Sequence, residues 1–180
     1  MTLSKRLQAV ADMVTPGYVV ADIGTDHGYI PIYLTKNKIA PKAYAMDINK
    51  GPIDRATENI HMEELQDKIK AIQSNGMEKL EPGMVQSVVI AGMGGELMID
   101  IIRNSPVIGT LKEMILSPHS DKDFVRKTMM KNNWKIIDET MVKDNDKYYC
   151  LIGAERKENL GTIVYYESNN LLDWKFKGEI

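Results

Sequence analysis

The spacing of apolar residues divides most of the chain into alternating helices and strands. Helical spacing covers residues 4–14, where Ser4 is placed to cap, and the segments that begin near Gly28, Gly51 and Gly95. Asp121 is placed to cap a further helix that ends near residue 132. Between these helices, short β-rich runs predict strands over residues 18–23, 42–48, 69–74, 87–91 and 113–116. The run at 87–91 has no polar alternation, which is typical of a parallel strand covered on both faces.

The pattern changes at Trp134. Residues 134–142 and 147–154 read as two strands joined by a tight polar turn at 144–146, which predicts an antiparallel hairpin. Five β–α units followed by a hairpin resemble the Rossmann-like α/β fold of the class I methyltransferases that use S-adenosylmethionine (SAM), and this fold is therefore expected. Their mostly parallel, seven-stranded sheet ends in such a hairpin, whereas dinucleotide dehydrogenases normally add another parallel crossover.

The chain is expected to form one methyltransferase domain over residues 1–157, which includes the helix over 4–14. The pattern weakens after residue 156, so residues 158–180 are expected to form a short C-terminal extension. This extension has candidate apolar anchors at Val164, Tyr165, Leu171 and Trp174.

Composition excludes several classes of protein. Of the 180 residues, 43% are hydrophobic and 27% charged, which is ordinary for a globular protein with a buried core. The apolar runs are too short to cross a bilayer, and the first residues lack the apolar stretch of a signal peptide. The lone Cys150 excludes an internal disulfide framework and fits a reducing cytoplasm, and its neighbours predict a buried, inert thiol. The net charge of −2 does not indicate a nucleic-acid binder, although a local basic patch is compatible with it.

The loop after the first strand favours SAM over a dinucleotide. The segment Ala-Asp-Ile-Gly-Thr-Asp-His-Gly at 21–28 lies at the expected switch point of the sheet. A dinucleotide fingerprint needs glycine two and five residues after Gly24, where this chain has Asp26 and Tyr29. Asp26 would bring a carboxylate towards a pyrophosphate, whereas SAM has no phosphate and carries a sulfonium and an ammonium group. The alternative is that Gly24 and Gly28 only permit tight packing of the strand against the helix.

Two further strand ends are candidate nucleoside contacts. Asp47 follows the second strand and can accept hydrogen bonds from both ribose hydroxyls, in NAD as well as in SAM. Alternatively, it is a solvated carboxylate. After the third strand, Asn75 can accept from an adenine amine and Met77 can supply an apolar face, but an ordinary Asn-Gly turn is the competing interpretation.

The segment Ala-Gly-Met-Gly-Gly at 91–95 follows the fourth strand. Its glycines let the backbone approach a ligand closely and offer amide donors at the start of a helix. The chain lacks the Asn-Pro-Pro-Tyr-like segment that many amino methyltransferases have at this place. The absence of this segment therefore favours a ring nitrogen over an exocyclic amine as the atom that is methylated.

Over residues 1–157 the chain resembles the TrmK family of bacterial tRNA (adenine-N1)-methyltransferases, which modify adenine 22. Its motifs are Leu-Ser-Lys-Arg-Leu at 3–7, Ala-Asp-Ile-Gly-Thr-Asp-His-Gly-Tyr-Ile-Pro at 21–31, Gly-Pro at 51–52 and Ile-Ala-Gly-Met-Gly-Gly at 90–95. The resemblance implies SAM as cofactor and tRNA as partner, with Asp26 at the family's proposed catalytic aspartate. It places in the SAM pocket Asp22, Gly24, His27, Asp47, Asn75, Gly76, Ala91, Gly92, Met93 and Gly94.

The chain departs from the family in three ways. Family members often have aspartate where this chain has Asn75, and the Leu-x-Pro-Asn loop of the family becomes Leu-Ser-Pro-His at 116–119. They also continue into a long helical coiled-coil domain that helps to hold tRNA, whereas this chain stops at Ile180. Either it is truncated or it is a shortened relative, so its own affinity for tRNA is an open question.

Asp26 is the candidate catalytic residue. Methylation of adenine N1 leaves a positive charge on the base, which a nearby carboxylate can stabilise while it orients the N6 amine. The competing interpretation is that Asp26 only caps the first helix after the glycine loop. His27 is expected to shape the site over the methionine part of SAM, and His61 to be solvated on a surface helix. The scattered His and Cys residues show no metal-ligand spacing.

The candidate RNA contacts are Lys5 and Arg6 near the expected pocket mouth, and Lys122 and Arg126 on one face of a helix. Such a run of charge is otherwise a solvated helix surface. Tyr29 either stacks on a flipped base or packs on the sheet.

The function expected first is tRNA adenine-N1 methylation. The alternatives are a SAM-dependent methyltransferase of another RNA or a small molecule, and a non-catalytic SAM- or RNA-binding module; the oligomeric state is open.

Overall fold

The computed structural model describes residues 2–157, together with the backbone of 164–168 and 174–179. Helices and strands alternate along the first part of the chain, as the sequence predicts. They are α1 (Lys5–Asp12), β1 (Val20–Ile23), α2 (Tyr29–Lys36), β2 (Ala43–Asp47), α3 (Lys50–Met62), β3 (Ile69–Gln73), β4 (Ser87–Ala91), α4 (Gly95–Arg103), β5 (Glu113–Ser117) and α5 (Lys122–Lys131). The hairpin follows as β6 (Trp134–Asp144) and β7 (Lys147–Arg156), and β8 (Val164–Ser168) pairs with β9 (Trp174–Glu179) in a separate sheet.

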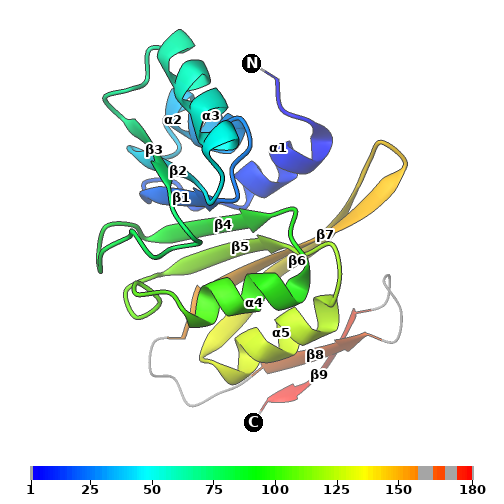
Figure 1. Cartoon of the computed structure of the whole chain (residues 1–180). Helices are drawn as coiled ribbons and strands as arrows, with labels where there is room; N and C mark the ends of the chain where they lie inside the picture. The colour runs from blue at the N-terminus through cyan, green and yellow to red at the C-terminus, as the bar shows by residue number, and fades with distance from the viewer. Residues whose placement is uncertain (1, 158–163, 169–173, 180) are drawn as a thin grey trace.

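Seven strands form one sheet in the order β3-β2-β1-β4-β5-β7-β6 (Figure 1). The first five are parallel to one another, and β7 runs antiparallel to both β5 and β6. The predicted Rossmann-like methyltransferase fold with a terminal antiparallel hairpin is confirmed. The chain winds outwards from β1 in one direction and from β4 in the other, so the switch point lies between these two central strands.

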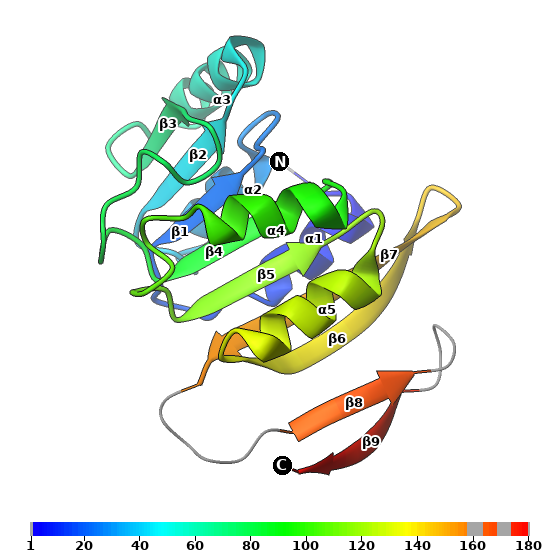
Figure 2. The same cartoon turned by 60° about the horizontal axis from the view of Figure 1, so that its bottom comes forward.

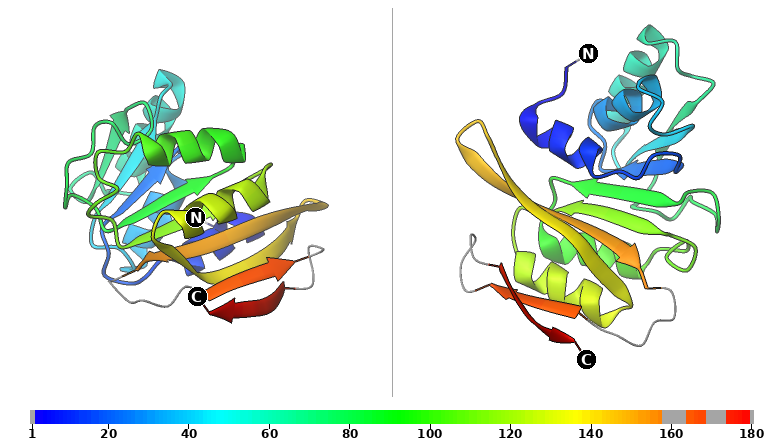
Figure 3. Two further views of the ribbon diagram at one scale, coloured as in Figure 1. Left: turned by 90° about the horizontal axis from the view of Figure 1, so that it is seen from below. Right: turned by 180° about the vertical axis from the view of Figure 1, so that it is seen from behind.

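Helices cover both faces of this sheet. Figure 2 shows α4 and α5 on one face, and the right-hand view of Figure 3 shows the blue α1 on the other, where α2 and α3 also pack. The apolar side chains of β4 are buried on both faces of the sheet. Val88 and Ile90 belong to the cluster beneath α4 and α5, whereas Val89 belongs to the cluster beneath α1 and α2. All three side chains are fully buried, as predicted for a strand covered on both faces.

Of three local predictions from the sequence, two are confirmed and one is wrong. Ser4 caps α1 through its Oγ, which accepts from the Leu7 amide at 3.3 Å. Asn145 and Asp146 form the hairpin turn with φ of 48° and 60°, the left-handed conformation that two-residue hairpin turns require. The predicted side-chain cap by Asp121 is wrong. That residue occupies the N-cap position of α5 with φ of 54°, makes no capping bond, and accepts instead from Ser120 Oγ at 2.6 Å.

Cys150 lies buried in β7, as predicted, and burial raises the pKa of its thiol, which disfavours the reactive thiolate. No helix in the described part of the chain is long and apolar enough to cross a membrane. The expected anchors of the extension, Val164, Tyr165, Leu171 and Trp174, lie outside the residues whose side chains the structure describes.

Candidate functional site

The carboxyl ends of the parallel strands bring five loops to one edge of the sheet. Because β1 and β4 are neighbours, the loops that follow them lie against each other. A side chain at Gly24, whose φ is +79°, would overlap the methyl end of Met93 from the neighbouring loop. The amides of Gly24 and Thr25 both donate to the Met46 carbonyl, at 2.8 and 2.9 Å, which ties the first loop to β2. Gly24 therefore serves close approach between two loops of the candidate site.

Gly28 has a different role from Gly24. It is the N-cap of α2 with φ of +70°, and a Cβ at this position would lie 3.3 Å from the Ala56 Cβ of α3. Close packing between α2 and α3 is therefore sufficient to explain the glycine at position 28. α2 also begins without a side-chain cap, which excludes Asp26 as the cap of this helix.

Asp22 lies beneath the first loop, at the end of β1. Only 6% of it is exposed, and burial raises the pKa of its carboxyl to about 6, an effect that the positive charge of Arg6 only partly opposes. The Arg6 side chain reaches inwards from α1, and its Nη1 would lie 3.4 Å from a Cβ at Gly92. This Nη1 atom is buried and has no hydrogen-bond partner within residues 2–157. A charged donor and a carboxyl thus face the two glycine loops from inside the protein.

Asp26 stands at the mouth of the site in a cluster of polar side chains. Its side chain is 64% exposed, and Oδ1 accepts from Nη2 of Arg55 on α3. Its Oδ2 lies 3.3 Å from His27 Nε2, and the His27 ring stacks on Tyr29 with ring centres 4.9 Å apart. Tyr29 is 38% exposed, so part of this residue is open to a ligand at the surface. Sequence reasoning missed Arg55, because its role depends on how α3 packs beside the first loop.

Asp47 ends β2 at the same edge. Its Oδ1 accepts from the Asn49 amide at 2.7 Å, which leaves Oδ2 available as an acceptor within the described part of the chain. Ile48 follows and is 57% exposed, an unusual position for a large apolar side chain. Sequence reasoning missed Ile48, although an apolar residue directly after the strand-end acid was a readable signal. Together the two residues offer an acceptor and an apolar surface at one point.

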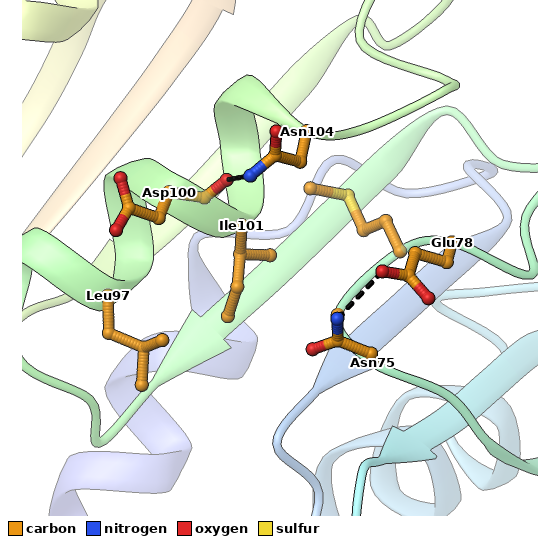
Figure 4. Close-up of a pocket in the computed structure, with 8 residues that line it drawn as sticks. Asn75, Glu78, Leu97, Asp100, Ile101 and Asn104 are labelled. Atoms are coloured by element: carbon orange, nitrogen blue, oxygen red, sulfur yellow. Dashed lines mark hydrogen bonds between the residues drawn. The ribbon is translucent and has the colours of Figure 1, made fainter.

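The loop after β3 faces α4 across a pocket of about 220 Å³ (Figure 4). Asn75 donates from Nδ2 to Glu78 Oε1 at 2.7 Å, so its Oδ1 remains an acceptor, as expected for contact with an amine. Gly76 has φ of +53°, and a Cβ there would come within 2.9 Å of Ile101 on α4. Met77 also lines the pocket but is only 1% exposed and lies in the core, so it offers a ligand little apolar surface.

The loop over residues 91–95 is held by the end of β5. The Gly92 amide donates to the Ser117 carbonyl at 3.1 Å, and the His119 amide donates to the Met93 carbonyl at 2.9 Å. Gly92 has φ of +97°, a conformation that favours glycine. Gly94 is the N-cap of α4 and, with Ala91, is half-buried. The loop thus lies at the start of a helix, where its backbone can approach a ligand.

The four candidate RNA contacts differ in how exposed they are. Lys5 is exposed on α1 and Lys122 is half-buried on α5. The prediction that Arg126 offers its guanidinium to RNA on an exposed face is wrong, because its side chain is only 7% exposed. It donates from Nε and Nη2 to Glu139 Oε1 of β6, at 3.1 and 2.6 Å. His61 is exposed on α3, as predicted.

The residues at this edge fit SAM by their chemistry. The buried polar atoms Arg6 Nη1 and Ser117 Oγ lie near the loops and have no hydrogen-bond partner within residues 2–157, which is costly unless a ligand or water supplies one. The site also gathers Asp22, Asp26 and Asp47, in accord with a ligand that carries cationic groups and a ribose. No group of three or more potential metal-ligating side chains occurs among the residues the structure describes.

Comparison with known proteins identifies the family. A family model described as a methyltransferase domain matches residues 3–152. The tRNA (adenine(22)-N(1))-methyltransferase of Bacillus subtilis is 36% identical over 86% of this chain and 66% of its own length. The crystal structure of the B. subtilis M1A22 tRNA methyltransferase TrmK aligns with a TM-score of 0.82 at 34% identity, covering 87% of this chain and 68% of that one.

The chain belongs to the TrmK family of methyltransferases. The resemblance read from its motifs is confirmed. A further member, the TrmK of M. capricolum in complex with the cofactor product S-adenosyl-homocysteine, aligns with a TM-score of 0.80 at 31% identity, covering 89% of this chain and 73% of that one. The chain spans about two thirds of the length of the relatives that it matches.

Proposed function

We propose that this chain is the catalytic domain of a SAM-dependent methyltransferase that modifies N1 of adenine 22 in tRNA. The observation that carries the proposal is the acidic glycine loop at 21–28. In this loop, Asp26 occupies the position at which a dinucleotide-binding enzyme has a phosphate-binding glycine. It is supported by relatives that are named for this reaction and match 86% and 87% of the chain. In this proposal, residues 1–157 form the catalytic unit and residues 158–180 form a short extension. The proposed location of the protein is the cytoplasm.

Binding of SAM is assigned to the loops at the carboxyl edge of the sheet. Asp47 would hold the ribose hydroxyls, while Ile48 and the pocket beside Asn75 would take the adenine. The backbone around Gly24 and Gly92 would approach the methionine part, with His27 shaping its outer side. When bound, SAM supplies a methyl group attached to a sulfonium. Loss of this methyl group converts the sulfonium into a neutral thioether, which is a good leaving group.

The protein's part in the reaction is alignment and electrostatics. Unprotonated adenine N1 is already a nucleophile, so a general base at N1 is unnecessary and the main task is to hold it in line with the methyl group. Asp26 would accept a hydrogen bond from the N6 amine and stabilise the positive charge that develops on the ring. Arg55 and His27 hold both carboxylate oxygens of Asp26 at the mouth of the site. They act as positioning residues for this carboxylate.

A ring nitrogen is favoured over the exocyclic amine. The loop at 91–95 lacks the Asn-Pro-Pro-Tyr-like segment whose carbonyls accept from a target amine. It offers instead the glycine backbone at the head of α4. This supports N1 as the acceptor of the methyl group.

The proposal is tested by incubating the chain with SAM and unmodified bulk tRNA, followed by mass analysis of the nucleosides. The expected product is 1-methyladenosine. A methylated product in another RNA or in a small molecule, but not in tRNA, would favour the alternative methyltransferase. SAM binding without any transfer would indicate a non-catalytic module.

A further inference from the structure

A second pocket opens where the β5–α5 loop meets the start of β7. It has a volume of about 240 Å³ and is lined by Pro118, His119, Lys147, Tyr148 and Tyr149, here called the hairpin pocket. None of the sequence-predicted site residues lines it. Its lining contains no acidic residue, and three of its five members carry an aromatic or imidazole ring.

The hairpin pocket adjoins the candidate methyl-transfer site. His119 forms part of its wall, and the His119 amide donates to the Met93 carbonyl at 2.9 Å. The imidazole would lie 3.8 Å from a Cβ at Gly92, so the pocket and the glycine loop share one boundary. A ligand that extends out of the methyl-transfer site past Gly92 would reach this pocket next.

Its aromatic rings are offered to a planar ligand. Tyr148 is 61% exposed, and its only described ring contact is with the Lys143 ammonium, 5.9 Å from the ring centre. Tyr149 lies deeper, beneath the Arg6 guanidinium at 5.0 Å and beside His119 at 6.0 Å. Exposed rings next to cations are the combination that proteins use to stack single-stranded bases.

Positive charge converges on the hairpin pocket from several elements. Partial burial, together with the charges of Arg6, Lys147 and Lys122, lowers the pKa of His119, which therefore remains neutral at physiological pH. Two acids at the hairpin turn are engaged by other groups. Asp144 accepts from the Arg6 amide at 3.2 Å, and Asp146 pairs with Lys143 at 3.1 Å. The surroundings of the pocket thus favour an anionic ligand.

We propose that the hairpin pocket binds an unstacked nucleotide of the RNA substrate, next to the adenine that is methylated. The base stacks on Tyr148, and Lys147 contacts its phosphate. This inference rests on the proposed function, because it deepens the same site by assigning the neighbour of the target nucleotide. An acidic protein segment is the competing occupant, but it makes no use of an exposed ring.

The test measures binding of unmodified tRNA and of a short single-stranded RNA by fluorescence anisotropy. Tyr148→Ala should weaken binding of both about tenfold, whereas Tyr148→Phe keeps the ring and should bind like the wild type. Lys147→Ala should reduce the slope of log affinity against log salt by about 0.7 to 0.9, the loss of one phosphate contact. Lys112→Ala is the matched control, because Lys112 lies 5.5 Å from the Tyr18 ring at the opposite edge of the sheet.

Unchanged RNA binding by a folded Tyr148→Ala protein would overturn the assignment. An equal loss in Tyr148→Phe would also overturn it, because stacking does not need the hydroxyl. Displacement of the short RNA by an acidic peptide, with the same dependence on Tyr148, would favour a protein partner instead. The methylation assay on the wild type separates the two proposals. Tyr148-dependent RNA binding without 1-methyladenosine would refute the proposed function and leave the pocket assigned to a nucleotide.

Discussion

Replacing Asp22 by asparagine should stabilise the ligand-free protein at neutral pH while it damages the cofactor site. Asp22 is 6% exposed, and burial raises the pKa of its carboxyl from 3.8 to about 6. A buried carboxylate of this kind is tolerated in the folded protein at a cost in stability, because its charge is better solvated in the unfolded chain. Asparagine has nearly the same shape and carries no charge, so the substitution removes this cost.

The size of the effect follows from the two pKa values. Each unit of pKa corresponds to about 1.4 kcal/mol, so a rise from 3.8 to about 6 corresponds to about 3 kcal/mol. The folded state binds the Asp22 proton more tightly than the unfolded state does. Stability from this group is therefore fully present below pH 3.8 and is lost as the pH rises to about 6. Above that pH the loss is constant.

The assay is chemical denaturation of the wild type and Asp22→Asn, without SAM, at a series of pH values from 4 to 8. The difference in unfolding free energy should grow in favour of the variant between pH 4 and 6 and then level off at about 3 kcal/mol. Taking the difference cancels the titration of other groups. A difference that does not change with pH, or a variant that becomes less stable as the pH rises, would refute the reasoning about burial.

Three further outcomes are expected. Asp26→Asn should keep its affinity for SAM but lower single-turnover methyl transfer by about tenfold to a thousandfold, whereas the exposed Asp54→Asn should leave the rate unchanged; wild-type turnover in Asp26→Asn would remove its catalytic role. Asp47→Ala should weaken SAM binding in calorimetry by about 1–3 kcal/mol, and an unchanged affinity would place Asp47 outside the site. Arg126→Met should lower the unfolding free energy by about 3 kcal/mol in denaturation, because it leaves Glu139 without its partner. Equal stability of Arg126→Met and the exposed Lys127→Met would contradict that assignment.

The regular parts of the fold were readable from the sequence because their signals are local. The uninterrupted apolar run of β4 indicated a strand between two layers, and the polar turn between two β-rich runs indicated the hairpin. Gly24 and Asp47 were predicted at strand ends, where the order of a parallel sheet determines their neighbours. These predictions needed only the period of the pattern and the position of the turns.

The remainder depended on contacts between elements distant in the sequence. Arg126 has the spacing of an exposed helical cation, but β6 passes beside α5 and places Glu139 within reach of it. Arg55 has no local signal of its role, since Asp26 is far away along the chain and meets it only through the packing of α3. The hairpin pocket likewise joins a loop after β5 to the start of β7. For Asp121, residue type suggested a cap, whereas the left-handed backbone directs the side chain elsewhere.

The most direct test of the central claim uses a defined tRNA transcript with adenine at position 22, and a second transcript in which only this adenine is replaced by guanine. Each is incubated with the chain and SAM, digested with a ribonuclease, and its fragments and nucleosides are analysed by mass spectrometry. The account predicts one added methyl group on the fragment that contains position 22, recovered as 1-methyladenosine, and none in the second transcript. Recovery of N6-methyladenosine, or equal methylation of both transcripts, would contradict it.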